Sequence, residues 1–226
     1  MAVVIEKYSR VEKNIIEDLG NYGVATIHEA QGRKGLMAPY MRPIYPGTRI
    51  SGTAVTVSVP PCDNWMIHVA AEVCQPGDIL VVAPTSLSDA GYFGDLLATL
   101  LMSKGVKALV IDAGVRDIAD LKEMGFPVWS KCISAQGTVK ETLGSVNIPV
   151  VCAGQTIHPG DAIIADDDGV VVVTVDEAED VLKKSKAREE KEAGIRKRYA
   201  AGELGLDMNN MRPALAEKGL KYPDRD

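Results

Sequence analysis

The sequence predicts an α/β protein whose sheet has a parallel component. Residues 95–129 alternate between helix-like and strand-like segments, which is the pattern of parallel strands connected by helices. The segments "QPGDILVVAP" and "HPGDAIIADD" each place an apolar strand after a Pro-Gly-Asp turn, which indicates two strands that begin alike in one sheet. The run "DGVVVVTV" is apolar enough for a buried strand.

Helices and a strand region are predicted for the first third of the chain. Apolar residues at helical spacing, closed by a glycine, predict a helix over 11–20, and a second short helix is expected over 25–32. The stretch 47–60 alternates and is rich in Val and Thr, so it predicts one or two strands. Asp63 is the candidate N-cap of a helix over 63–74.

The remainder of the core is predicted to alternate between strands and helices. The expected order is a strand within 75–84, a helix over 95–104, a strand over 107–112, a helix over 117–124, a strand over 126–129, short strands and turns over 130–157, and strands within 158–167 and 168–175. The run Asp166–Asp168 resembles a carboxylate cluster for a metal, but Asp and Gly are also expected in a turn before a strand. We favour the turn.

A charged C-terminal helix follows the last predicted strand. Thr174 and Glu177 fit a capping box that begins a helix over about 176–200. The last 25 residues carry Gly, Pro and charge and are poorly suited to a core. We therefore predict one α/β domain over 1–175 and a helical extension over 176–226, which either packs on a neighbouring subunit or is simply solvated.

The charge of the chain argues against nucleic-acid binding. The formal net charge is −6, and the basic residues at 183–186 and 196–198 are interleaved with glutamates, as on a solvated helix. The longest apolar runs fall far short of the roughly 20 residues of a membrane span, and the N-terminus does not resemble a secretory signal. We expect a cytoplasmic protein without a nucleic-acid or membrane partner.

The cysteines indicate neither a disulfide framework nor a zinc site, because they are scattered and contain no CxxC pair. They are Cys62, Cys74, Cys132 and Cys152.

Two carboxylates and a guanidinium lie at the two ends of the apolar segment "GDLLATLLMSKGVKALVIDAGVRD". Asp95 begins a helix whose free N–H groups form an anion site, and Gly94 lets a ligand approach the backbone. Arg116 and Asp117 follow a strand, at the end of the sheet where ligands bind. Such a set suits Mg²⁺ with a small anionic substrate. Alternatively, both aspartates are helix caps and Arg116 forms a surface ion pair.

The segment also resembles a known family. Asp117 follows Asp95 of the Gly-Asp pair by 22 positions, and this spacing is similar to the signature of the class II 4-hydroxy-4-methyl-2-oxoglutarate / 4-carboxy-4-hydroxy-2-oxoadipate aldolases. Their superfamily includes the regulator of ribonuclease activity A. The resemblance extends over "GTVKETLGSVNIPVVCAG" and "PGDAIIADDDGVVVV". It implies a compact layered α/β sandwich of the swivelling-domain kind, self-associated into trimers or hexamers, with the C-terminal helix on a neighbouring subunit.

The resemblance also implies roles for the residues of this segment. Asp117 would be the direct ligand of Mg²⁺ or Mn²⁺, and Asp95 would hold a metal-bound water. Arg116 would bind the pyruvyl group and stabilise its enolate. The pyruvyl carboxylate would be held by the backbone amides of Gly94, Asp95, Leu96 and Leu97.

Three further residues are carried over from the family. Glu192 would reach the metal waters of an adjacent subunit, and Asn64 and Lys140 lie in segments that hold substrate-site residues. A helical ion pair explains Glu192 equally well, a solvated loop explains Lys140, and Asn64 could assist the helix start. His68 lies one turn after Asn64, where apolar neighbours favour a core or rim role.

The activity implied is a retro-aldol cleavage of 4-carboxy-4-hydroxy-2-oxoadipate or 4-hydroxy-4-methyl-2-oxoglutarate. One product would be pyruvate, and the other would be oxaloacetate or a second pyruvate, depending on the C4 substituent. Oxaloacetate decarboxylation would be a side activity. The pathway would be the degradation of protocatechuate or gallate. Water held by Asp95 would be the base. The alternative functions are a Schiff-base aldolase using Lys107, a non-enzymatic binding protein similar to the ribonuclease regulator, and a dedicated oxaloacetate decarboxylase.

Overall fold

The computed structural model describes residues 1–223. Its chain divides into two compact units after Ser185. The predicted extension over 176–226 begins before this division, and its last three residues, 224–226, lie outside the described residues. The proposal that 1–175 is the catalytic domain stays a prediction.

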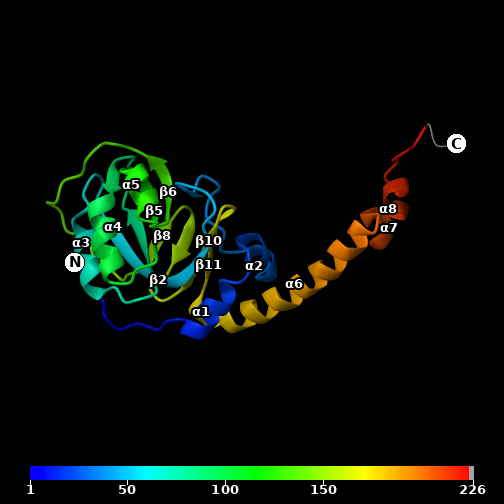
Figure 1. Cartoon of the computed structure of the whole chain (residues 1–226), viewed down its shortest axis with the longest axis horizontal. Coiled ribbons are helices and arrows are strands. Elements are labelled where there is room, and N and C mark those ends of the chain that lie inside the picture. The colour runs from blue at the N-terminus through cyan, green and yellow to red at the C-terminus, as the bar shows by residue number, and fades with distance from the viewer. Residues whose placement is uncertain (224–226) are drawn as a thin grey trace. The chain divides into compact units, whose positions relative to one another are not determined.

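The helices of the first unit agree with the predicted ones to within two residues at each end (Figure 1). They are α1 (Lys13–Leu19), α2 (Val24–Ala30), α3 (Trp65–Val73), α4 (Asp95–Ser103), α5 (Ile118–Glu123) and the beginning of α6 (Ala178–Ala200).

The strands include several that the sequence did not predict individually. They are β1 (Arg42–Pro43), β2 (Ile50–Val59), β3 (Asp78–Pro84), β4 (Gly91–Phe93), β5 (Ala108–Val115), β6 (Val128–Ile133), β7 (Ser145–Val146), β8 (Val150–Cys152), β9 (Gln155–Ile157), β10 (Ala162–Asp166) and β11 (Gly169–Val173). The predicted turn at Asp166–Asp168 is confirmed, because these residues join β10 to its antiparallel neighbour β11.

The main sheet is mixed and strongly curved. Its order is β1-β6-β5-β3-β2-β10-β11, with parallel pairs from β2 to β6 and antiparallel pairs toward both edges. Across the two ends of this order, Arg42 donates to the carbonyl of Asp168, and Trp129 Nε1 donates to the carbonyl of Asp166 at 2.8 Å. The sheet therefore nearly closes like a barrel. The α/β class with a parallel component is confirmed, but the sheet is more curved than a layered sandwich implies.

The two Pro-Gly-Asp segments form the same kind of turn, as predicted. Gly77 and Gly160 adopt φ of 96° and 94°, values that glycine reaches without strain. The carboxylates of Asp78 and Asp161 accept a backbone N–H from three residues earlier, at 2.7 and 2.9 Å. The strands that follow, β3 and β10, flank β2 on its two sides. These turns thus fix the starts of both neighbours of β2.

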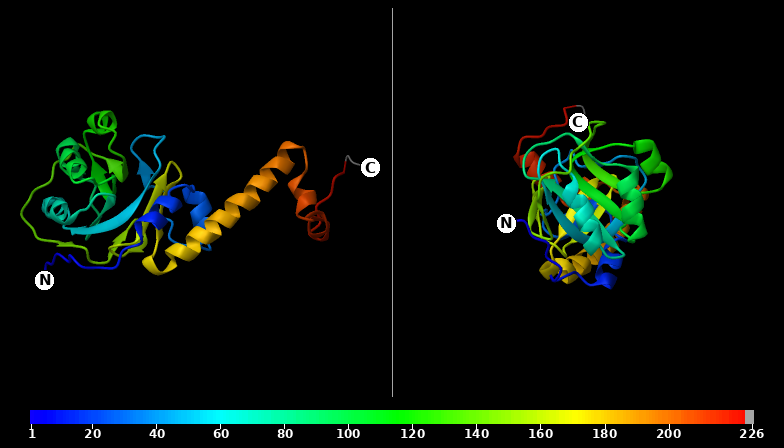
Figure 2. Two further views of the ribbon diagram at one scale, coloured as in Figure 1. Left: turned by 60° about the horizontal axis from the view of Figure 1, so that its bottom comes forward. Right: turned by 90° about the vertical axis from the view of Figure 1, so that its left-hand side faces the viewer.

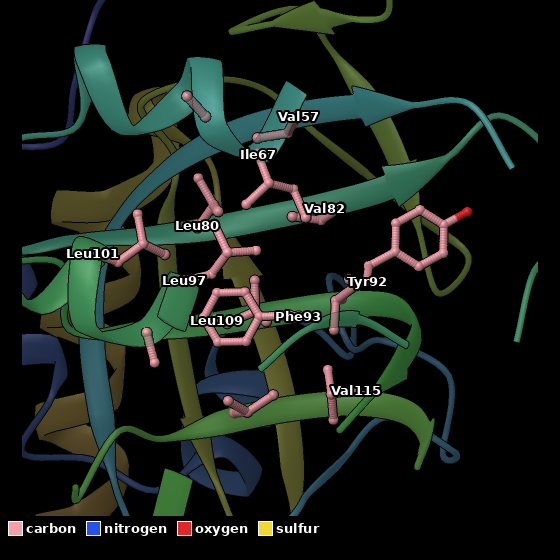
Figure 3. Packing of buried hydrophobic residues seen from close by; sticks show 14 of the residues in the cluster. Val57, Ile67, Leu80, Val82, Tyr92, Phe93, Leu97, Leu101, Leu109 and Val115 are labelled. Atoms are coloured by element: carbon pink, nitrogen blue, oxygen red, sulfur yellow. The ribbon is translucent and has the colours of Figure 1, made fainter. Parts of the chain in front are cut away.

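The apolar core has three parts. Helices α3, α4 and α5 cover one face of the sheet, where fully buried side chains such as Ile67, Leu80 and Leu101 meet (Figure 3). A second cluster fills the concave face around Trp129. In the third cluster, helices α1 and α2 pack on β10 and β11 (Figure 2). Each fully buried side chain of this size contributes about 1.5–3 kcal/mol, so the helices that carry the site residues are firmly held.

The start of the C-terminal helix differs from the predicted capping box. Thr174 precedes a short 3-10 turn, Val175–Glu177, and its hydroxyl contacts the Glu177 carboxylate at 3.3 Å instead of accepting a backbone N–H. The turn separates Thr174 from the first residue of α6, which is why the box does not form.

The second unit contains the rest of α6, α7 (Gly205–Met208) and α8 (Arg212–Glu217). None of its described residues, 186–223, is buried, which agrees with the prediction that the last 25 residues are poorly suited to a core. Within residues 1–223, no helix has the length and apolar character to cross a membrane.

Candidate active site

Nearly all of the site residues predicted from the sequence line one pocket of about 260 Å³. The pocket lies where β4 and β5 end and where α3 and α4 begin, at the carboxyl end of the parallel strands. The lining residues are Asn64, His68, Tyr92, Gly94, Asp95, Leu96, Leu97, Arg116, Asp117 and Lys140.

The two ends of the apolar segment 94–117 meet in this pocket. Asp117 Oδ2 lies 3.4 Å from the backbone nitrogen of Asp95, 22 residues earlier in the chain. An added Cβ at Gly94 would overlap Asp117 Oδ2 and would lie 3.0 Å from Asp117 Cγ. Gly94 itself has an extended backbone, with φ −156°. A glycine is therefore required here by the close approach of the carboxylate and not by the backbone conformation.

Asp117 and Arg116 form the charged floor of the pocket. Arg116 Nε lies 3.6 Å from Asp117 Oδ2, and the side chains are 48% and 33% exposed, so both remain accessible to a ligand. Asp117 occupies the N-cap position of α5, but its side chain makes no capping hydrogen bond. Its φ is 57°, a left-handed conformation that is uncommon for a residue with a side chain. Asp117 is thus the N-cap of α5 by position but does not cap the helix with its side chain, and the predicted ion pair of Arg116 is present.

The N-terminus of α4 faces the same pocket. Asp95 is the first helical residue and not its N-cap, and the N-cap Gly94 supplies no side-chain hydrogen bond to the helix. The amide of Asp95 points at Asp117 Oδ2, and the next amides of α4, those of Leu96 and Leu97, are left for a ligand at the end of the helix where its dipole favours an anion. Of the two leucines in this first turn, Leu96 is 79% exposed and Leu97 is 7% exposed.

Asn64 and Tyr92 form a buried polar wall of the pocket. Asn64 Nδ2 donates to the carbonyl of Tyr92 at 2.8 Å, and Asn64 Oδ1 is buried without a hydrogen-bond partner among the described residues. An unsatisfied buried acceptor is costly, so this oxygen is a place for a donor from a ligand or from water. The Tyr92 hydroxyl accepts the N–H of Cys62 and donates to the carbonyl of Pro60. Sequence reasoning missed Tyr92, because its role depends on backbone contacts that no local pattern reveals.

Lys140 and His68 place one permanent positive charge and one imidazole at the α3 side of the pocket. Burial lowers the pKa of His68, and the neighbouring Lys140 ammonium lowers it further, so the neutral imidazole is favoured. His68 is half-buried on the pocket rim, as its apolar neighbours predicted.

Glu192 is not among the residues that line this pocket. It belongs to the second unit and lies 2.8 Å from Arg188 and 3.6 Å from Arg196 on its own helix. The predicted role of Glu192 in an adjacent subunit stays a prediction. Within residues 1–223, no three His, Cys, Asp or Glu side chains gather in a way that could hold a metal by themselves.

Lys107, the candidate for a Schiff base, lies at a different place. It lines a separate cavity of about 540 Å³ together with Arg10 and Thr53, and its ammonium donates to the carbonyl of Ser51 at 2.9 Å. That cavity contains neither Arg116 nor Asp117. The smaller pocket, and not the larger cavity, therefore contains Arg116 and Asp117.

Known proteins share both the sequence and the fold. A model of the family described as "RraA-like: Aldolase/RraA" matches residues 15–172, which is more than half of the chain. A Halalkalibacterium halodurans protein, provisionally named 4-hydroxy-4-methyl-2-oxoglutarate aldolase, is 28% identical over 181 residues, which cover 80% of this chain and 86% of that protein.

Solved structures agree with this assignment. An uncharacterized protein from Pseudomonas syringae superposes with a TM-score of 0.76 and 26% identity, covering 87% of this chain and 97% of that one. Streptomyces coelicolor RraAS2, described as an unusual member of the RNase ES inhibitor RraA protein family, gives a TM-score of 0.75 and 27% identity over 84% of this chain and 99% of its own. The chain therefore belongs to the RraA-like family, with its Aldolase/RraA members.

Proposed function

We propose that the chain is a divalent-metal-dependent pyruvate aldolase. Its substrates are 4-hydroxy-2-oxo acids such as 4-carboxy-4-hydroxy-2-oxoadipate and 4-hydroxy-4-methyl-2-oxoglutarate. Each is cleaved to pyruvate and a second product, which is oxaloacetate or another pyruvate, depending on the C4 substituent. The observation that carries the proposal is the meeting of Arg116, Asp117 and the N-terminus of α4 in one small pocket. The aldolase name of the Halalkalibacterium halodurans relative points to the same chemistry.

The donors in the pocket fit a largely hydrated Mg²⁺ or Mn²⁺. Mg²⁺ typically takes one or two protein carboxylates and keeps several waters, so a set of three protein ligands is not needed. Asp117 supplies a carboxylate that is one-third exposed and free of capping bonds, and Asp95 is the nearest second carboxylate in the lining. Asp117 would hold the ion, and Asp95 would act through water.

The chain's own residues bind and orient the pyruvyl end of the substrate. The amides of residues 94–97 receive its carboxylate at the positive end of α4. Arg116 places its guanidinium beside the keto oxygen, where negative charge develops as the C3–C4 bond breaks and its electron pair moves to C3. The metal, when bound, adds Lewis-acid stabilisation of the same charge.

Proton transfer is assigned to the water beside Asp95. This water removes the C4 hydroxyl proton while C4 becomes a carbonyl group, and a proton returned to C3 then releases pyruvate. Asn64 and Lys140 face the part of the substrate beyond C4. Oxaloacetate decarboxylation passes through the same enolate and is the expected side activity.

The assembly and the pathway belong to the same proposal. We assign Glu192 of a neighbouring copy to the waters of the metal site, within a trimer or hexamer. Degradation of protocatechuate or gallate would supply substrates of this class.

The test is pyruvate release from 4-carboxy-4-hydroxy-2-oxoadipate, coupled to lactate dehydrogenase. Release is expected to stop after EDTA treatment and to return with Mg²⁺. Release should be lost in Asp117→Asn, which removes the carboxylate charge, and in Arg116→Lys, which replaces the planar guanidinium by an ammonium group. Asp120→Asn, which changes an exposed carboxylate on α5, is the matched control and should remain active. A folded protein without metal-dependent release would contradict the proposal and would favour a dedicated decarboxylase or a binding protein.

A further inference from the structure

We propose that Asp63 is a positioning residue that holds the Lys140 ammonium in place and thereby sets the affinity for the substituent at C4. This inference rests on the proposed function. Asp63 is not among the residues that line the pocket. Two residues near it, Asn64 and Lys140, do line the pocket. Its carboxylate connects the two chain segments that carry them.

Lys140 lies in a long segment that has little support of its own. Residues 134–144, between β6 and β7, form neither a helix nor a named strand. Lys140 is exposed, and the adjacent Val139 is 50% exposed, so apolar burial does not fix this part of the chain. Hydrogen bonds to the backbone on either side of Lys140 therefore determine where this segment, from which the ammonium extends, lies.

Those hydrogen bonds converge on residues 62–64. The amide of Asn64 donates to the carbonyl of Val139 at 3.1 Å, and the amide of Val139 donates to the carbonyl of Cys62 at 2.9 Å. Asp63 Oδ2 then accepts the amides of Glu141 and Thr142, both at 2.7 Å. Lys140 is therefore held on both sides, and the bonds on its C-terminal side depend on a single carboxylate oxygen.

The other oxygen of Asp63 fixes the carboxylate to the helix. Asp63 Oδ1 accepts the amide of Trp65 at 2.9 Å, at the start of α3, and the residue is only 1% exposed. The same buried carboxylate therefore ties the first turn of α3, which carries Asn64, to the backbone beside Lys140. An asparagine at this position has only one side-chain oxygen. It could accept either the amide of Trp65 or the amides of Glu141 and Thr142, and its NH₂ group would face the N–H donors on the other side.

The first test is Asp63→Asn compared with the wild type on two reactions. For 4-carboxy-4-hydroxy-2-oxoadipate, whose C4 carboxylate reaches toward Lys140, KM should rise about tenfold, the effect of losing about one hydrogen bond's worth of positioning. Deuterium exchange of the pyruvate methyl group, which needs only the Arg116 and Asp117 end, should change less than about twofold. Asp161→Asn is the matched control, because Asp161 is also buried and accepts two backbone amides, at 2.9 and 3.2 Å.

The second measurement does not depend on activity. Amide hydrogen exchange of residues 139–144 should become about tenfold faster in Asp63→Asn than in the wild type or in Asp161→Asn. If both reactions fall equally, or if neither the KM nor the amide exchange changes, Asp63 does not position Lys140. A wild-type protein that is inactive in both reactions contradicts the proposed function, and the amide exchange then still decides whether Asp63 holds the segment of Lys140.

Discussion

Replacement of Gly94 by alanine tests the geometry of the pocket most sharply. The backbone of Gly94 is extended, so alanine can adopt it without strain. The added Cβ, however, would overlap Asp117 Oδ2 and would approach Asp117 Cγ to 3.0 Å and Arg116 Cγ to 3.3 Å. Optimal contact between carbon atoms is about 3.5–4.0 Å, so Cγ of Asp117 has to retreat by roughly 0.5–1 Å, and the overlapping Oδ2 has to move further.

Two effects of known size follow from this displacement. Overpacking of this kind costs about 1–3 kcal/mol of stability. A shift of about 1 Å in a group that positions the substrate can cost about 100-fold in rate. Gly94→Ala should therefore fold, with a lowered midpoint of unfolding, and should lose about 100-fold in metal-dependent pyruvate release.

Gly23→Ala is the matched control for this substitution. Gly23 is also the N-cap of a helix in an extended conformation, but an added Cβ would meet Asp166 Oδ2 at an ordinary 3.5 Å. Steady-state kinetics and urea denaturation of both variants give the comparison. Wild-type kinetics in Gly94→Ala, or an equal loss in Gly23→Ala, would show that the contact between residue 94 and Asp117 does not control the rate.

Three further predictions concern other parts of the chain. Trp129→Phe removes the 2.8 Å bond to the Asp166 carbonyl inside the barrel, so urea denaturation should show a loss of about 1–3 kcal/mol, and an unchanged midpoint would contradict the role of this bond. Burial raises the pKa of Asp63, but backbone hydrogen bonds and Lys140 outweigh it and hold that pKa below the ordinary 3.8. The stability that Asp63 contributes is thus fully present above pH 3.8 and is lost as the pH falls through its lowered pKa, so the stability difference between wild type and Asp63→Asn should shrink in acid and not at neutral pH. Glu192→Gln should change the melting temperature little, because exposed helical pairs contribute only about 0.2–0.5 kcal/mol, yet it should raise the Mg²⁺ concentration needed for half-maximal rate, and an unaltered Mg²⁺ dependence would exclude the role in a neighbouring subunit.

The elements with strong local signals could be predicted from the sequence. The start of α4 was predicted because Gly94 and Asp95 precede an apolar run at helical spacing, and the two Pro-Gly-Asp turns because glycine and aspartate have definite turn roles. The end of β5 was predicted three residues too early, at 112 and not at Val115. Gly114 lies within the strand, and the carbonyls of Asp89 and Ala90 approach it too closely for a Cβ.

Contacts between distant segments could not be predicted. The curvature that brings Trp129 to Asp166 depends on strand pairs that no local pattern encodes. For the site, the convergence of Asp95 with Arg116 and Asp117 could be expected from the carboxyl ends of parallel strands. Asp63 was predicted as a local cap, and one of its oxygens does accept the amide of Trp65, but its bonds to residues 141 and 142 required the folded structure.

Deuterium incorporation into the methyl group of pyruvate, followed by NMR in deuterated water, directly reports whether this pocket forms pyruvate enolate. This exchange requires the enolate and nothing of the substrate beyond C3. We expect rapid exchange by the wild type with Mg²⁺, little exchange with EDTA, and little in Asp117→Asn or Arg116→Lys. Exchange that persists in both variants, or that is absent from the folded wild type with Mg²⁺, would contradict the assignment of this pocket to pyruvate enolate chemistry.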